Sequence, residues 1–167
     1  MLSLSEPTEI GAALTGAPLF LAPMTPAAAG TLGEAFSAID PWVRYPFTAQ
    51  ALSTHLGTNE PGAPRYVLHA ENETAGTMTL RLNWLSGPYL QFFGILPRFQ
   101  RQGIGSVALT WLESGARAEK ARNLWVAASD FNTGALRLYE RHGFQRVARL
   151  DDLVKDGFTE VLMRKRL

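Results

Sequence analysis

One stretch of this chain decides its fold: Pro97-Arg-Phe-Gln-Arg-Gln-Gly103-Ile-Gly105-Ser106. It follows an apolar run at residues 89–96 that predicts a strand, and it precedes a run at 107–120 that predicts a helix. Because glycines lack side chains, Gly103 and Gly105 allow backbone N–H groups to converge on an anion. The first turn of the helix adds unpaired N–H groups and the positive end of its dipole. The stretch therefore predicts a loop that binds the phosphates of a cofactor.

The composition is that of an ordinary globular protein of one domain. The 167 residues are 46% hydrophobic and 19% charged. A chain of this length buries about 70% of its unfolded surface around one core. It has no cysteine, which excludes disulfides, thiolate metal ligands and a cysteine nucleophile. The three histidines show no metal-binding spacing, so we expect no metal site.

Charge is distributed unevenly along the chain. The net charge of +1 argues against bulk affinity for nucleic acid. Residues 1–97 have a charge balance of −4 and residues 98–167 a balance of +5, so excess positive charge begins at the glycine loop. This distribution suits a phosphate ligand, and solvated helix faces explain it equally well.

The N-terminal region is rich in Ala, Gly and Leu but lacks the pattern of a targeting segment. No Lys or Arg precedes Arg44, so the positive region of a signal peptide is missing. Prolines at positions 18, 23 and 26 interrupt any membrane-spanning helix. We therefore expect a cytoplasmic protein without membrane contact, with a loosely ordered segment at residues 1–17 and one domain at 18–167.

Hydrophobic periodicity and turn signals predict a sheet interspersed with helices. The sequence predicts strands at 18–24, 65–71, 76–84, 89–96, 124–129, 145–150 and 158–163, and helices at 31–39, 48–56, 107–120 and 132–142. The strand series is largely antiparallel, so the predicted class is α/β or α+β with a mixed sheet. Gly143 is expected to end the last helix, with Phe144 packing behind it.

The glycine loop alone also fits other cofactor loops. Residues 103–108 satisfy a relaxed dinucleotide-binding pattern, which requires an acidic residue about 20 positions later. This chain has Asn123 there, at the entrance to a strand. A Walker loop is excluded because no Gly-Lys-Ser/Thr follows. A nicotinamide enzyme is kept as an alternative.

A second motif follows the strand at 124–129: Asn132-Thr-Gly-Ala135-Leu-Arg-Leu-Tyr139-Glu-Arg-His-Gly143-Phe144. Together the two motifs closely resemble those of the GNAT acyltransferase superfamily, which transfers acyl groups from acyl-coenzyme A. The cofactor motif of that family is matched by Gln100, Gly103 and Gly105, and its later motif by positions 132, 135, 139, 143 and 144. The resemblance extends from about residue 18 to residue 167. It implies a GNAT-like mixed, mostly antiparallel central sheet of about six to seven strands flanked by helices.

The resemblance further implies that acetyl-CoA is the cofactor. The end of the strand at 89–96 would bind the amides of the pantetheine arm as though the arm were another strand. The N–H of Ile95 is also expected to donate to the thioester carbonyl. The cofactor-binding residues that we expect are Ile95, Leu96, Gln100, Arg101, Gln102, Gly103, Ile104, Gly105, Ser106, Asn132 and Ala135.

Tyr139 is the catalytic residue that the resemblance implies, as the general acid for the departing CoA thiolate. An ordinary phenol of pKa about 10 and a thiol of about 8.5 make this proton transfer slightly uphill. A well-placed general acid typically contributes about 10²–10⁴ in rate. Ala135 lies four residues earlier on the same helix face and leaves room for the cofactor arm. Outside the motif, Tyr139 would be a packing tyrosine and Asn132 only a helix N-cap, a role that we expect Asn132 to have as well.

The base that accepts the proton of the amine is not evident. Some relatives carry a glutamate on the strand before the asparagine, where this chain has Ala127. Glu71, Glu73 and His69 are the remaining candidates. The segment at 40–47 and Trp84 are candidates for shaping the acceptor pocket.

The sequence predicts an acetyl-CoA-dependent N-acetyltransferase of a small-molecule or peptide amine. Transfer is expected to be direct, because no cysteine is available to carry the acyl group. The alternative is a non-catalytic acyl-CoA-binding sensor of the same fold. An exposed strand near the C-terminus is compatible with a homodimer.

Overall fold

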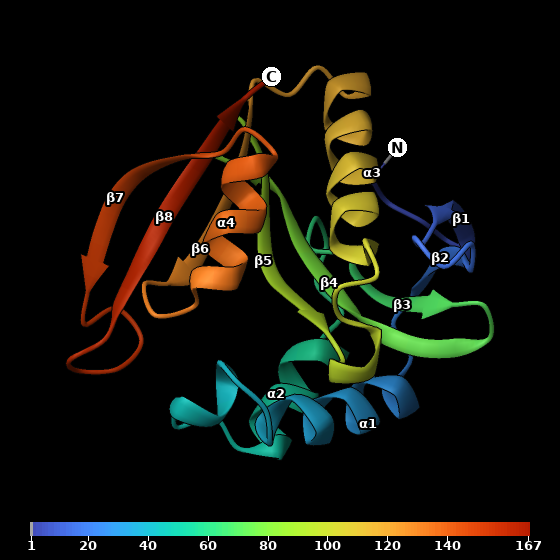
Figure 1. Cartoon of the computed structure of the whole chain (residues 1–167), viewed down its shortest axis with the longest axis horizontal. Coiled ribbons are helices and arrows are strands. Elements are labelled where there is room, and N and C mark those ends of the chain that lie inside the picture. The colour runs from blue at the N-terminus through green and yellow to red at the C-terminus, as the bar shows by residue number, and fades with distance from the viewer. Residues whose placement is uncertain (1) are drawn as a thin grey trace.

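One sheet forms the centre of the protein, which was analysed as a computed structural model describing residues 2–167 (Figure 1). Residue 1 lies outside the described residues. The strands are β1 Thr8–Ala12, β2 Pro18–Pro23, β3 Arg65–Ala70, β4 Glu73–Trp84, β5 Gly87–Ile95, β6 Asn123–Ser129, β7 Gln145–Asp151 and β8 Thr159–Arg166. The α-helices are α1 Pro26–Ser37, α2 Ala49–Gly57, α3 Ile104–Ala118 and α4 Thr133–Arg141, with short 3-10 helices η1 Trp42–Arg44 and η2 Pro97–Phe99. In the sheet the order is β1-β2-β3-β4-β5-β6-β8-β7.

The sheet opens in its middle, between β5 and β6. Every other neighbouring pair is antiparallel, whereas β5 and β6 are parallel and pair only at Tyr89–Trp125 and Leu90–Val126. Just beyond this junction the register of β5 on β4 shifts, so that Gln91 is the extra residue of a β-bulge. A bulge bends its strand, and β5 and β6 continue without pairing. The rest of β5 therefore presents a backbone edge inside the sheet.

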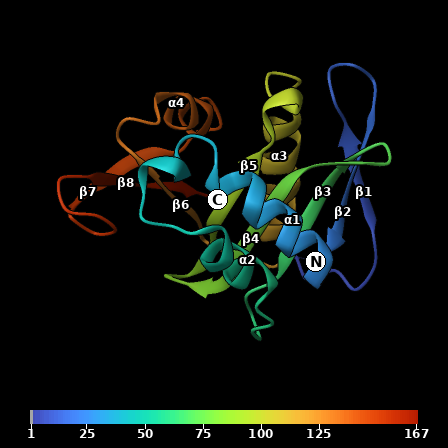
Figure 2. The same cartoon turned by 90° about the horizontal axis from the view of Figure 1, so that it is seen from below.

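Alternating side chains divide the core into two layers. Along β3, Tyr66 and Leu68 belong to a cluster with residues of α3 and α4, whereas Val67 packs with residues of α1 and α2. This division follows from the period of two along a strand. Figures 1 and 2 show α1 and α2 side by side, and Figure 1 shows them apart from α3 and α4. The helices therefore cover both faces of the sheet.

The mixed, mostly antiparallel sheet flanked by helices confirms the predicted fold class, with eight strands in place of six to seven. The additional strand, β1, lies in the N-terminal segment that we expected to be loosely ordered, and it pairs with β2. Leu2 is fully buried, and its carbonyl accepts a 2.5 Å hydrogen bond from the Tyr66 hydroxyl. A Cβ on Gly115 would lie 2.4 Å from Leu2, so this glycine of α3 provides the space that Leu2 fills. Specific packing thus orders a segment that has little periodicity of its own.

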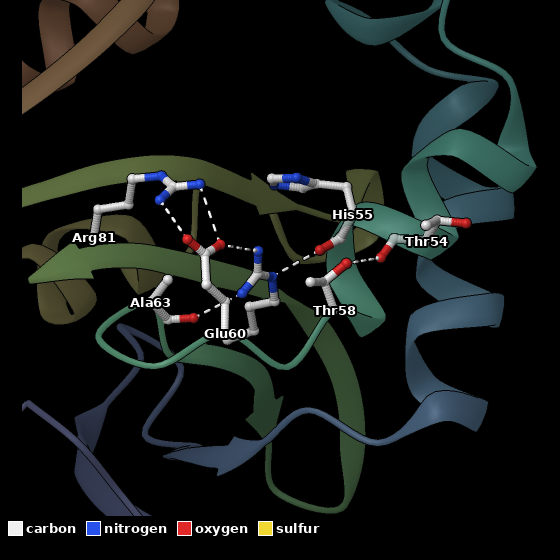
Figure 3. A network of polar contacts seen from close by, with 7 residues as sticks. Thr54, His55, Thr58, Glu60, Ala63 and Arg81 are labelled. Atoms are coloured by element: carbon white, nitrogen blue, oxygen red, sulfur yellow. Dashed lines mark hydrogen bonds and ion pairs between the residues drawn. The ribbon is translucent and has the colours of Figure 1, made fainter.

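A buried arginine fastens α2 to the sheet (Figure 3). Arg65 at the start of β3 donates through Nε to the His55 carbonyl at 2.7 Å and through Nη1 to the Ala63 carbonyl at 2.8 Å. Its second Nη lies 3.7 Å from Glu60, whose carboxylate is also paired with Arg81 at 2.8 Å. The network fixes the end of α2 on which His55 lies.

None of the helices in residues 2–167 has both the length and the apolar character that a bilayer crossing requires.

Candidate active site

The predicted phosphate loop forms one wall of a cavity of about 590 Å³. The end of β5, the first turn of α3, the helix α4 and the segment around η1 also line it. This cavity is lined by most of the site residues that we predicted from the sequence. They are Ile95, Gln100, Arg101, Gly103, Ile104, Gly105, Ser106, Asn132, Ala135 and Tyr139.

The loop has the backbone conformation that its glycine predicts. Gly103 is the N-cap of α3 with φ 77°, in the left-handed region that glycine adopts without strain. A Cβ at Gly103 would lie 2.8 Å from Leu14 Cγ, so a side chain there would also clash. The first turns of α3 and α4 both line the cavity and contain no acidic residue. Two helix N-termini with unpaired N–H groups thus make the cavity attractive to an anion.

The backbone of Ile95 faces the gap in the sheet. The Leu96 N–H donates to the Ala75 carbonyl at 2.8 Å, and the Gly94 carbonyl lies against Gly76 of β4. Because alternate residues of a strand direct their backbone groups to opposite sides, those of Ile95 point away from β4. Its carbonyl accepts a 2.9 Å hydrogen bond from the Gln100 side chain, which leaves the N–H on the open edge. That N–H is suitably placed for the amide or thioester carbonyl of an extended ligand.

Two of the nominated residues, Leu96 and Gln102, do not line the cavity. Leu96 packs against both core clusters. The Gln102 side chain donates to the Arg98 carbonyl at 2.9 Å, and the backbone carbonyl of Gln102 accepts from the Leu14 N–H at 2.8 Å. Both residues therefore stabilise the conformation of the loop from outside the cavity.

Tyr139 lies on the cavity side of α4 and is 5% exposed. Its helix starts as predicted, with the Asn132 side chain accepting from the Ala135 N–H at 3.2 Å, and it ends before Gly143 at φ 82°. Phe144 packs edge-on against the phenol ring, with 5.8 Å between the ring centroids. These contacts fix the direction of the Tyr139 side chain.

Burial, with a smaller contribution from the nearby Tyr89, raises the pKa of Tyr139 above that of an ordinary phenol. The hydroxyl is therefore protonated at neutral pH, as a general acid must be. Transfer of its proton to a thiolate is, however, more uphill than ordinary pKa values suggest.

A second cavity, of about 470 Å³, meets the first. It lies over the junction of β5 and β6 and is bounded by α2, the segment around η1 and the loop between β7 and β8. The residues that line both cavities are Pro41, Trp42, Phe93, Asn132, Ala135 and Tyr139. Tyr139 thus lies where a ligand in one cavity would meet a ligand in the other.

The second cavity contains a buried polar cluster that sequence reasoning missed. Glu160 on β8 is opposite Ser129 on β6 in the strand register and is 9% exposed. The Tyr45 hydroxyl donates to Glu160 Oε1 and also contacts the Ser129 hydroxyl. Burial, followed by the hydrogen bond to Glu160, raises the pKa of Tyr45 to about 12, so that this hydroxyl stays a donor. These three residues are distant in the sequence and meet only in the folded chain. A single glutamate in a predicted strand, such as Glu160, did not indicate a functional site.

The residues considered earlier as bases lie elsewhere. Glu71, Glu73 and His69 line neither cavity, and Glu73 is paired with Arg98. Trp84 packs against Tyr89 and Trp125 and lines neither cavity. The segment at 40–47, in contrast, contributes residues to both. Within residues 2–167, no three His, Asp or Glu side chains are grouped so that they could hold a metal ion.

Comparison with known proteins identifies a family of acetyltransferases that this chain matches. The family described as "Acetyltransferase (GNAT) family" matches residues 30–144. S-(2-succino)cysteine N-acetyltransferase of Bacillus subtilis (strain 168) is 29% identical over 110 residues, which are 61% of this chain and 66% of that protein. The match thus spans just under two thirds of the length of this relative.

Solved structures share the fold. The ribosomal L7/L12 alpha-N-protein acetyltransferase has a TM-score of 0.76 at 17% identity, covering 100% of this chain and 99% of that one. A Bacillus anthracis chain assigned as a streptothricin acetyltransferase, solved in complex with acetyl coenzyme A, has a TM-score of 0.59 at 15% identity, covering 68% and 67%. At these identities the likeness concerns the fold alone.

Proposed function

Because the chain belongs to the GNAT acetyltransferase family, we propose that it transfers an acetyl group from acetyl-CoA directly to a primary amine. The observation that carries this proposal is the meeting of the two cavities at Tyr139. The first cavity would hold the cofactor and the second the acceptor. The complex of a structural neighbour with acetyl coenzyme A supports the choice of cofactor.

The residues of the first cavity suit coenzyme A. The first turns of α3 and α4 and the Arg101 side chain would bind its phosphates, and the open edge at Ile95 would bind its pantetheine amides. When bound, acetyl-CoA would supply the acetyl group as a thioester. The acceptor ammonium would lose two protons as its nitrogen bonds to the acetyl carbon and the C–S bond breaks, and one proton would reach the sulfur while the other leaves to solvent.

The protein would contribute orientation and hydrogen bonds to this reaction. The Ile95 N–H would stabilise the carbonyl oxygen as it gains negative charge. The buried Tyr139 hydroxyl would donate to the sulfur, and it would recover its proton as the nitrogen loses one. Direct transfer agrees with the lack of a cysteine nucleophile.

The proposal is tested by calorimetric titration with CoA and by thiol release from acetyl-CoA with a panel of amines. We expect Tyr139→Phe to lower turnover at least tenfold while the CoA dissociation constant changes less than twofold. Tyr66→Phe is the control, because Tyr66 is equally buried but lines neither cavity. Its turnover per folded molecule should equal that of the wild type.

Other outcomes would favour other functions. Tight CoA binding without thiol release for any amine would favour the acyl-CoA sensor. Thermal stabilisation by NAD and none by CoA would favour the nicotinamide enzyme. Unchanged turnover of Tyr139→Phe would remove Tyr139 from the mechanism. The homodimer stays a prediction, to be tested by sedimentation, and β7 is the sheet edge at which it would form.

A further inference from the structure

The wall of the second cavity contains one charged group, a carboxylate. Among the residues that line it, Glu160 is the one acidic side chain, and neither Lys nor Arg contributes to the wall within the described residues 2–167. His55 also lines the cavity, but burial, followed by Arg65 and Arg81, lowers its pKa, so that it is neutral at pH 7. The remaining wall is largely aromatic and aliphatic and includes Trp42, Tyr45, Phe47, Tyr89, Phe92 and Val154.

Hydrogen bonds hold the Glu160 carboxylate in place, and this carboxylate can accept further hydrogen bonds. Its Oε1 accepts from Tyr45 and lies 3.3 Å from the Ser129 hydroxyl, whereas its Oε2 lies 3.5 Å from Ser129, at the limit of a hydrogen bond. A carboxylate has about four acceptor sites, so donors from a ligand would complete its coordination.

A second acceptor in the same wall lacks a partner. The amide oxygen of Gln91, the bulge residue of β5, is buried and has no hydrogen-bond partner within residues 2–167. Buried polar atoms are nearly always hydrogen-bonded, because leaving one unpaired costs free energy. An ammonium group has three N–H donors and no acceptor, which matches the two acceptors, Glu160 and the Gln91 amide oxygen.

Resting on the proposed function, we propose that Glu160 binds the ammonium group of the acceptor, and that the acceptor is a primary amine on an apolar body without a carboxylate. Two cations that neighbour lining residues in the sequence, Arg44 beside Tyr45 and Lys155 beside Val154, are engaged elsewhere. Arg44 is paired with Asp40 at 2.7 Å, and Lys155 donates to the Arg44 carbonyl at 2.7 Å. An acceptor carboxylate in the cavity would therefore lie beside Glu160 without a compensating charge.

Binding measurements test the role of Glu160 without requiring turnover. In the presence of saturating CoA, 2-phenylethylamine and its uncharged analogue 2-phenylethanol are titrated into the wild type and Glu160→Gln. We expect Glu160→Gln to weaken binding of the amine at least tenfold and to change that of the alcohol less than twofold. The CoA dissociation constant should stay within twofold. Equal loss for both ligands, or no loss for the amine, would overturn the assignment.

Tyr45→Phe separates charge from packing. It removes the hydrogen bond to Glu160 but keeps the carboxylate and the aromatic wall. We expect it to retain most of the amine affinity, so that the amine-to-alcohol preference stays within threefold of that of the wild type. If the two variants lost the same preference, Glu160 would act through structure alone, and the proposal would fail.

Matched acceptors test the substrate class. Phenylalanine amide should bind, and if turned over should release thiol, at least tenfold better than phenylalanine, which differs by its carboxylate. S-(2-succino)cysteine, whose succino group adds further carboxylates, should be a poor ligand as well. Equal or better binding of the carboxylates would overturn the substrate class. If the amines bind through Glu160 but no thiol is released, the proposed function fails and the binding site stands.

Discussion

At the scale of single residues, the two glycines of the loop have different tasks. Gly103 has φ 77°, and a Cβ there would lie 2.8 Å from Leu14. Gly105 lies within α3, where a Cβ would meet the flexible end of Leu138 at 3.1 Å. One glycine is required by the backbone, whereas the other only leaves space.

This difference predicts opposite results for the same substitution. Gly103→Ala should lower the free energy of unfolding by about 1–2 kcal/mol, the cost of a side chain in the left-handed region, and should weaken CoA binding. Gly105→Ala should leave stability unchanged or raise it slightly, because alanine favours a helix over glycine. Urea denaturation and CoA titration measure both effects. Equal stability of the two variants would contradict the assignment of Gly103 as the N-cap.

The positions of single residues were predictable where a local motif contains them. The positions of Tyr139, Asn132 and Gly143 follow from one continuous stretch of helix, so sequence spacing places them correctly. Glu160 and Tyr45 lie 115 residues apart, and their meeting depends on the pairing of β8 with β6 and on the course of the chain around η1. Periodicity within one element contains no information on such a contact.

At the scale of elements, a charged group as well as an apolar face holds α2 against the sheet. Arg65 reaches across from β3 to two carbonyl groups, one of them that of His55 at the end of α2 (Figure 3). Burial opposes protonation of His55, and the positive charges of Arg65 and Arg81 oppose it further. Protonation of His55 and folding are therefore coupled.

The coupling predicts a loss of stability on mild acidification. Folding lowers the pKa of His55 from its ordinary value of 6.5, so just below that pH the unfolded chain binds more protons than the folded one. The free energy of unfolding should therefore fall as pH decreases from 7.5 through 6.5 to 5.5. His55→Gln should reduce this slope, as measured by urea denaturation at the three pH values. Burial, followed by Lys165, also lowers the pKa of His142, so part of the slope should remain.

Element boundaries were predictable where caps and periodicity coincide. The helix at 107–120 corresponds to α3, which extends three residues further toward the glycine loop. The helix expected at 31–39 begins earlier, because Thr25 caps it and Pro26 is tolerated in the first turn. Pro26, which argued against a membrane-spanning helix, thus marks the start of a shorter one.

At the scale of the whole molecule, both cavities depend on how β5 and β6 separate. The two strands are joined by only two residue pairs at one end. At that end, the turn before β5 is also hydrogen-bonded to β6. Asn123 and Trp125 donate to the Leu85 carbonyl at 3.3 and 3.1 Å. The sequence could not predict this opening, because it arises from a bulge and from pairing between distant segments. The junction therefore sets the width of the gap into which both ligands would enter.

Gly87, the first residue of β5, allows the close approach at this junction. A Cβ there would lie 1.8 Å from the Asn123 carbonyl oxygen, and this contact is with backbone that no side-chain rotation can move. Gly87→Ala should therefore push β5 and β6 apart and lower the free energy of unfolding by about 1–3 kcal/mol, the usual range for overpacking. Because Phe93 of β5 lines both cavities, a shift of this strand should weaken CoA and amine binding together, unlike Glu160→Gln. Thermal denaturation and the two titrations measure these effects.

Gly30→Ala is the matched control for Gly87→Ala. Gly30 lies in α1, and a Cβ there would meet nothing within 4 Å. Alanine favours the helix by up to about 1 kcal/mol, so this variant should be as stable as the wild type or more so, with both affinities unchanged. A Gly87→Ala variant with wild-type stability and wild-type binding would mean that the junction does not set the gap. The two cavities would then have to be positioned by the helices alone.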